Sequence, residues 1–134
     1  MDGRRTTALG AALMGLAVVL GAFGAHGLRA RLSPDLLEIW ETGVRYHAYH
    51  AIGLVLAGLL ALVAERDAQG RGDRASAGLG PAAVAFVLGI AIFSGSLYAL
   101  ALTGLRWLGA ITPIGGVAFI AGWILLARAA LRRD

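Results

Sequence analysis

The chain contains no cysteine, no lysine and no asparagine, and it has few charged residues of any kind. Without cysteine there can be no disulfide, no thiolate metal site and no thiol nucleophile. Charged residues make up 15% of the sequence, against about 25% in an average soluble domain. All twelve basic residues are arginine, and the formal net charge is +4. These absences exclude an ordinary soluble domain and any cysteine-based chemistry.

Apolar residues are abundant instead, and they are grouped in long blocks. They make up 58% of the 134 residues, and the mean hydropathy is +0.74. Each block is close to the roughly 20 residues that cross a hydrocarbon core of about 30 Å. The first block is longer than the roughly 7–15 residues of a signal-peptide core, which favours a retained helix. We therefore predict an all-α membrane protein, a single four-helix transmembrane bundle over 1–134, with spans at about 6–28, 46–64, 81–102 and 107–126.

The distribution of arginine predicts the orientation of these spans. Basic residues in short loops stay on the cytoplasmic side of a membrane. Eight arginines fall in the N-terminus, the middle loop 65–80 and the C-terminus, and four fall in the other two loops. We expect a bacterial inner-membrane protein with both termini in the cytoplasm and the middle loop as a flexible linker. Topology and lipid headgroups explain the basic residues, so no nucleic-acid partner is expected.

The segment between the first two spans carries a helix-start signal. Ser33, Pro34 and Asp35 place a capping hydroxyl, a proline and an acid in the order found at helix N-termini. Apolar residues then recur at near-helical spacing opposite acidic ones. This pattern predicts a short amphipathic helix at about 34–44 that lies in the outer interface, with Trp40 and Trp107 in the aromatic belt.

Small residues recur four apart within the predicted spans, which is the spacing that allows helices in lipid to approach closely. We interpret most of these pairs as internal packing of the bundle, with a dedicated oligomer face as the alternative. The pairs are Ala17/Gly21/Ala25, Gly53/Ala57, Ala85/Gly89 and Ala118/Gly122.

Polar side chains from all four spans fall in the outer half of the predicted bundle. Their depths follow from a rise of roughly 1.5 Å per helical residue. Pro113 removes a backbone donor from the fourth span and predicts a kink near Gly115 and Gly116. Polar groups inside membranes are candidate functional sites. The candidate site comprises His26, Arg45, Tyr46, His47, His50, Ser94, Ser96, Tyr98 and Thr112.

Several interpretations of this polar cluster remain open. If its side chains form hydrogen bonds between helices, the cluster has the structural role of stabilising helix packing. A small quinone-like or anionic ligand could lie under Arg45, or the histidines could form a proton-linked cluster. His26, His47 and His50 also meet the ligand count of a zinc or copper site, with His26 and His50 as the metal candidates, and a histidine pair can ligate haem iron.

Short blocks across nearly the whole chain resemble a family of small bacterial inner-membrane proteins, domain of unknown function 423, also called YgdD-like. The resemblance implies a four-span bundle in the inner membrane and no established activity. The position of His47 resembles one that carries glutamine in a relative, which favours a pair formed by His26 and His50. The matching blocks are Leu20 to His26, Thr42-Gly43 with Tyr46 and His50, Phe93 to Tyr98, Ala101-Leu102, Thr112 to Gly116, and Ala121 to Trp123.

Three functions are therefore in competition. The first is a non-enzymatic accessory, assembly or stabilising subunit of a larger membrane complex. The second is a small oligomeric transporter or channel, although the sequence lacks both the membrane-embedded glutamate of small multidrug exporters and the pore asparagine of dimeric fluoride channels. The third is a protein that binds haem, a metal or a quinone through its outer histidines.

Overall fold

The computed structural model describes residues 2–71 and 79–131, and nearly all of these residues are helical. Four helices are long and apolar enough to cross a membrane: Gly3–Leu28, Pro34–Arg66, Leu79–Thr103 and Arg106–Leu131. This confirms the predicted all-α class and the four spans. The elements are α1 (Gly3–Phe23), η1 (Gly24–Leu28), α2 (Pro34–Arg71), α3 (Leu79–Gly89), η2 (Ile90–Ser94), α4 (Gly95–Thr103), η3 (Arg106–Ala110) and α5 (Thr112–Leu131).

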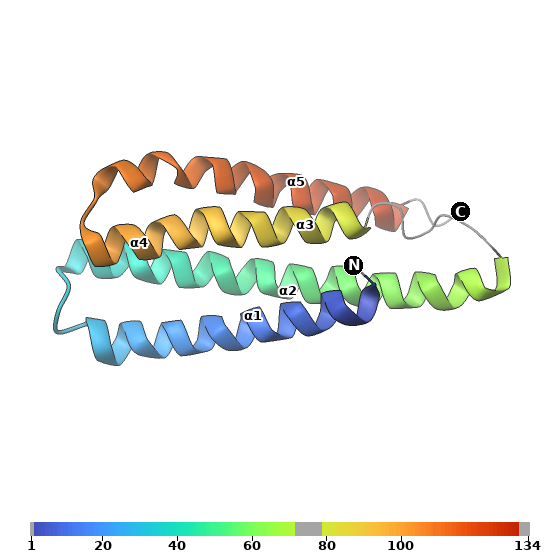
Figure 1. The fold of residues 1–134 in the computed structure, drawn as a ribbon, viewed down its shortest axis with the longest axis horizontal. Helices are drawn as coiled ribbons and strands as arrows, with labels where there is room; N and C mark the ends of the chain where they lie inside the picture. Colours follow the sequence, from blue (N-terminus) through green and yellow to red (C-terminus); the bar gives the residue numbers. More distant parts are fainter. Residues whose placement is uncertain (1, 72–78, 132–134) are drawn as a thin grey trace.

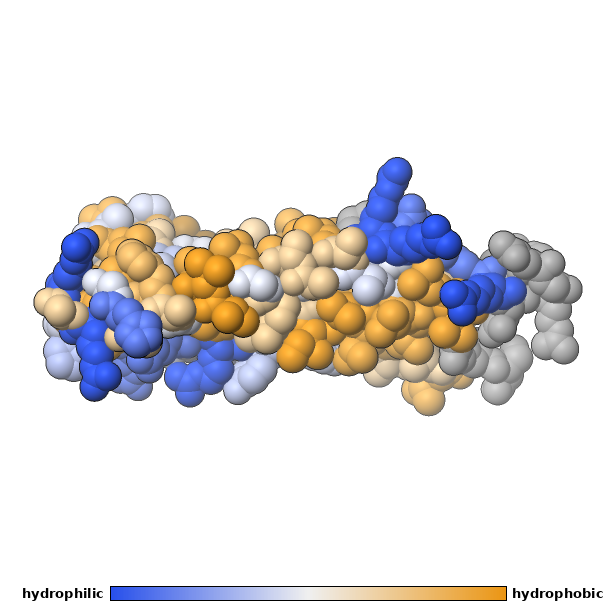
Figure 2. Space-filling view, turned by 90° about the horizontal axis from the view of Figure 1, so that it is seen from below, coloured by the Kyte–Doolittle hydropathy of each residue, from blue (hydrophilic) through white to orange (hydrophobic). Residues whose placement is uncertain are grey.

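The four spans pack in chain order, with α2 and the α3–η2–α4 span in the middle (Figure 1). On the two sides, α1 packs along α2, and α5 packs along α3 and η2. Both connections, 29–33 and 104–105, lie at one end, which we call the loop end, and the first residues of α1 lie toward the other, the terminal end (Figure 1). An apolar band separates hydrophilic ends in the space-filling view (Figure 2), as expected for a membrane-spanning protein.

The helix predicted at 34–44 is present, but it is not a separate interfacial helix. It begins at Pro34 as expected, and the Leu36 N–H donates to the Ser33 hydroxyl at 3.4 Å. It then continues without a break into the second span, because no proline interrupts it and Gly43 is buried against the Tyr98 ring of α4. The first third of α2 is therefore part of the bundle.

Trp40 illustrates the same correction. Its side chain is only 3% exposed, and its Nε1–H donates to the carbonyl of Leu20 at 3.0 Å. A Cβ at Gly24 would lie 2.7 Å from the indole, so glycine at this position makes room for the ring. Trp40 is therefore packed inside the bundle and does not face the headgroups as a residue of the aromatic belt would, whereas Trp107 is 62% exposed at the loop end.

The predicted middle linker is shorter than 65–80. Helix α2 extends to Arg71 and α3 begins at Leu79, while residues 72–78 lie outside the described part of the chain. Glu65, which we placed in the linker, accepts a hydrogen bond from the N–H of Gly3 at 3.0 Å. A carboxylate at a helix N-terminus satisfies an otherwise free donor and interacts favourably with the helix dipole. This contact ties the start of α1 to α2.

Glycines allow aromatic rings to fill the interior of the bundle. Gly53 and Gly122 both pack against the ring of Phe86, and Gly89 packs against the ring of Phe119. Both phenylalanines are almost completely buried. The predicted role in internal packing is thus confirmed for these three glycines. Each leaves space on its own helix that an aromatic ring from another helix fills.

Candidate functional site

The two histidines of α2 lie in different surroundings, although they are three residues apart. His47 is 2% exposed, and its Nδ1 is 3.2 Å from the Tyr98 hydroxyl of α4. The Tyr98 ring also packs against Trp40, with ring centroids 4.7 Å apart. The other ring nitrogen of His47, Nε2, is buried and has no hydrogen-bond partner in the described structure. His47 therefore contacts α4 through a polar bond and retains an unpaired nitrogen.

His50 points about 60° around the helix axis from His47, and there it lies among aromatic rings. Its imidazole stacks on Phe119 of α5 with centroids 3.3 Å apart and an angle of 8° between the planes. The rings of Phe86 and Trp123 lie within about 6 Å of it, at 5.9 and 6.1 Å. Its Nδ1 is 2.6 Å from the carbonyl oxygen of Tyr46, one turn earlier in α2. This histidine joins α2 to α5 by ring stacking.

Two serines at the η2–α4 junction differ in their hydrogen bonding, since Ser96 has partners and Ser94 has none in the described structure. Ser96 donates to the carbonyl of Phe93 at 2.9 Å and is 2.8 Å from the Thr112 hydroxyl, which links α4 to α5. Ser94 is fully buried, and its hydroxyl oxygen has no partner in the described structure. Gly43 of α2 packs against Leu97 and Tyr98, so the antiparallel register places Ser94 about level with His47. Two buried polar atoms without partners thus lie at a similar depth.

Single turns of π-helix occur in two of the spans. One is η1, which contains His26, and the other is η2, which ends at Ser94. Such turns are rare in α-helices and are frequent at functional sites. Neither was predictable from periodicity, because one additional residue in a turn barely changes an apolar pattern.

His26 does not join the other histidines. It is exposed at the loop end of the first span, while His47 and His50 are buried. Among the described residues no group of three or more histidine, cysteine, aspartate or glutamate side chains is arranged to hold a metal ion. The three-histidine constellation proposed from the sequence is therefore not assembled in this structure.

The remaining predicted residues occupy the surface or a helix start. Arg45 is exposed, and Tyr46 is 39% exposed with its ring 4.6 Å from that of Phe93. Pro113 lies in the first turn of α5, where its missing N–H leaves no helical bond unmade. The helix geometry changes before it, at Ile111, and α5 runs as uninterrupted α-helix through Gly115 and Gly116.

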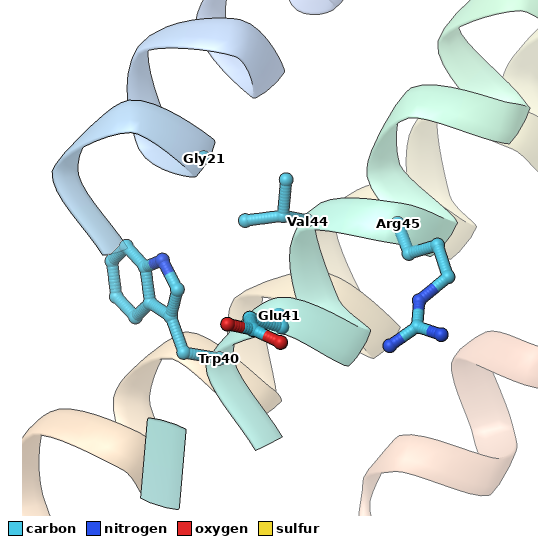
Figure 3. A pocket seen from close by; sticks show the side chains of 5 residues that line it. All are labelled: Gly21, Trp40, Glu41, Val44 and Arg45. Atoms are coloured by element: carbon cyan, nitrogen blue, oxygen red, sulfur yellow. The ribbon is translucent and has the colours of Figure 1, made fainter. Parts of the chain in front are cut away.

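Sequence reasoning missed the aromatic residues that surround His50. The rings of Phe86, Phe119 and Trp123 surround His50 but read as ordinary apolar positions. It also missed a hollow of about 400 Å³ between α1 and α2, lined by Gly21, Trp40, Glu41, Val44 and Arg45 (Figure 3). The sequence feature that could have indicated this hollow is the pair of opposite charges at Glu41 and Arg45, one helical turn apart.

Comparison with known proteins identifies the family but no activity. The model of the family described as protein of unknown function (DUF423) matches residues 20–116, which include both buried histidines. The chain is 48% identical over 127 residues to the UPF0382 membrane protein YwdK of Bacillus subtilis, with 92% of this chain and 94% of the relative covered. It is 45% identical over 118 residues to the UPF0382 membrane protein SH2409 of Staphylococcus haemolyticus, with 88% of each chain covered.

A third relative, the UPF0382 membrane protein SERP0230 of Staphylococcus epidermidis, is 46% identical over 124 residues, with 92% of this chain and 93% of the relative covered. No solved structure matches the chain significantly. The three relatives are described as membrane proteins, in agreement with the four apolar helices found here. The protein is a membrane protein and belongs to the DUF423 family.

Proposed function

We propose that this protein is a non-enzymatic accessory subunit of the bacterial inner membrane, which packs against a transmembrane helix of a larger membrane protein. The contact surface is the first half of α1, on the side that faces away from α2. The observation that carries the proposal is the size of the side chains on this surface.

The outward side of α1 carries small residues along its first half. Ala8, Ala12 and Gly15 are exposed and share one helix face, and Ala11 lies beside them. A Cβ added at Gly15 would meet no atom within 4 Å, so this glycine does not serve packing within the described chain. Because lipid chains gain nothing from a small side chain, a face of alanine and glycine favours close approach of another helix.

Helix α5 provides the contrast, since it also borders the bundle on one side only. Its outward residues in the same membrane region are large: Ile114, Val117, Ile120 and Ile124 are each more than half exposed. Bulky, β-branched side chains suit contact with lipid and keep another backbone at a distance. The difference between the two helices supports a protein partner at α1 and lipid at α5.

The polar interior supports a structural role over a catalytic one. The Tyr98 hydroxyl is used by His47, and Ser96 and Thr112 bond to each other, so these groups link helices of the same chain. His50 is enclosed by aromatic rings. Interhelical hydrogen bonds of this kind stabilise membrane bundles by around 1 kcal/mol or less each. Their arrangement favours a stable bundle that acts through its surface.

The distribution of charge supports an orientation with both termini in the cytoplasm. Arg4 lies in the first turn of α1, Arg66 at the end of the second span and Arg128 in the last turn of α5, all at helix ends away from the two connections. By sequence, eight of the twelve arginines belong to the termini and the segment between the second and third spans. The positive-inside rule then assigns the terminal end to the cytoplasm.

Photocrosslinking in the native membrane tests the proposed contact. A photoreactive amino acid would be placed at Ala8 or Ala12 on α1, with Val117 and Ile120 on α5 as matched lipid-facing controls. We expect both α1 positions to crosslink to the same transmembrane protein, identified by mass spectrometry, and the α5 positions to give no such product. Gly15→Leu should lower the crosslink yield severalfold, because the added side chain separates the two backbones.

Other crosslinking results would contradict the proposed contact. Crosslinks between two copies of the chain would replace the accessory role by a homo-oligomer and favour the transporter or channel. Crosslinks to lipid only, or equal protein crosslinks from α1 and α5, would contradict the assignment of the α1 face.

A further inference from the structure

The hollow between α1 and α2 has fixed walls and lies toward the loop end. Gly21 contributes no side chain, and the nearest atom to a Cβ placed there is a methyl carbon of Val44, at 3.4 Å. On the other side, the indole of Trp40 is held by its hydrogen bond to Leu20 and by the neighbouring ring of Phe23 at 5.9 Å. The volume of about 400 Å³ therefore belongs to a preformed groove, of a size found for small-ligand sites.

Two opposite charges line this groove on the side of α2. Glu41 and Arg45 are exposed and lie one helical turn apart. They do not pair with each other, since the only ion pair among the side chains that the structure describes, those of residues 2–66 and 79–131, joins Arg5 and Asp2. Figure 3 shows the Glu41 carboxylate directed toward Trp40 and the Arg45 guanidinium extending away from it. Both charged groups are thus free to bind a ligand that carries both signs.

The depth of Glu41 and Arg45 in the membrane indicates where a ligand bound by them would lie. Gly3, the first residue of α1, packs against Leu62 near the terminal end. Arg45 lies about 17 residues from Leu62 along α2, which is roughly 26 Å, and Glu41 lies one turn further. The hydrocarbon core is about 30 Å thick. The pair therefore lies where the hydrocarbon meets the headgroups on the loop side of the bilayer.

We propose that this groove binds one zwitterionic phospholipid with a primary amine, phosphatidylethanolamine. The Arg45 guanidinium donates to the phosphate, for which its planar fork of N–H groups is well suited. The Glu41 carboxylate accepts hydrogen bonds from the ammonium group. The adjoining acyl chain lies over Gly21 and Val44. Phosphatidylglycerol could offer Glu41 a hydroxyl group but no positive charge, and a choline headgroup could not donate a hydrogen bond to it.

Competitive lipid retention tests this assignment. The full chain would be reconstituted into bilayers with equal amounts of phosphatidylethanolamine, phosphatidylcholine and phosphatidylglycerol, extracted in mild detergent, and analysed by mass spectrometry for lipid bound per protein. We expect about threefold enrichment of phosphatidylethanolamine over phosphatidylcholine, the discrimination available from one partly exposed charge pair. Glu41→Gln should abolish that preference but keep phospholipid bound, and Arg45→Gln should lower retention of all three lipids.

Two further variants separate the groove from general electrostatic attraction. Arg29→Gln removes an exposed arginine at the same end that does not line the groove, so it should leave retention unchanged. Gly21→Leu fills the groove and should abolish retention without lowering the melting temperature. The proposal is wrong if wild-type protein retains the two zwitterionic lipids equally, if it prefers phosphatidylglycerol, if Arg29→Gln acts like Arg45→Gln, or if folded Gly21→Leu still retains phosphatidylethanolamine.

Discussion

His47 and His50 start from the same helix, one turn apart, and meet opposite kinds of surroundings. His47 is bonded to the Tyr98 hydroxyl and keeps a buried nitrogen without a partner, whereas His50 is stacked on Phe119 among aromatic rings. The difference arises from the neighbouring helices: α4 supplies Tyr98 beside His47, whereas α3 and α5 supply Phe86 and Phe119 beside His50. A central helix can therefore use one residue type as a hydrogen-bonding group on one side and as a packing ring on the other.

The largest effect is expected from removing the ring on which His50 stacks. Phe119→Ala eliminates the stacking contact and opens a cavity beside Gly89 and His50, since Phe119 is 3% exposed. We expect a loss of about 2–3 kcal/mol in unfolding free energy, less than for a soluble core because lipid also solvates the ring. Thermal or denaturant unfolding in detergent measures it. Val117→Ala, on the exposed side of α5, is the control and should change stability by less than about 0.5 kcal/mol.

A double-mutant cycle sharpens the comparison between the histidines. His47→Leu and Tyr98→Phe each remove one partner of the same hydrogen bond, so their effects should be coupled by about 0.6–1.7 kcal/mol. His50→Leu and Tyr98→Phe share no contact and should be additive. Equal coupling in the two cycles would show that the two sides of α2 are not independent.

The smallest effect distinguishes the two serines. Ser96→Ala breaks the bond to Thr112 and should cost about 0.5–1 kcal/mol. Ser94→Ala removes a buried hydroxyl that has no partner, so it should leave the unfolding free energy unchanged or raise it slightly. Comparing the two melting temperatures checks this, and a larger loss for Ser94→Ala would mean that its hydroxyl is bonded.

The sequence was sufficient for the features that depend on local chemistry. Long apolar blocks predicted the four spans, and Ser33 before Pro34 predicted the start of α2. The fate of Trp40 was not predictable, because its burial depends on Gly24 in another helix and on the continuation of α2 past Gly43. The surface position of Arg45 also depends on tertiary structure, since periodicity does not say which side of α2 meets lipid.

The candidate site also combines features that residue types and depth indicated with features that depend on side-chain packing. Residue types and depth grouped Ser96, Thr112, His47 and Tyr98 in one half of the bundle without pairing them. In the structure Ser96 lies within hydrogen-bond distance of Thr112, and His47 of Tyr98. The separation of His26 from the other histidines, and the aromatic rings around His50, follow from side-chain packing that one sequence does not encode locally.

The pairing of α1 with α2, and of α3 with α5, has a consequence for biosynthesis. Each pair forms a hairpin of spans that are consecutive in the chain, so its closest contacts connect segments synthesised one after the other. The first hairpin includes the bond from Gly3 to Glu65 and the burial of Trp40 under α1. It can reach its packed form in the membrane before the second hairpin has left the ribosome, so that the contacts of α2 with α3, η2, α4 and α5 are the ones that await the complete chain.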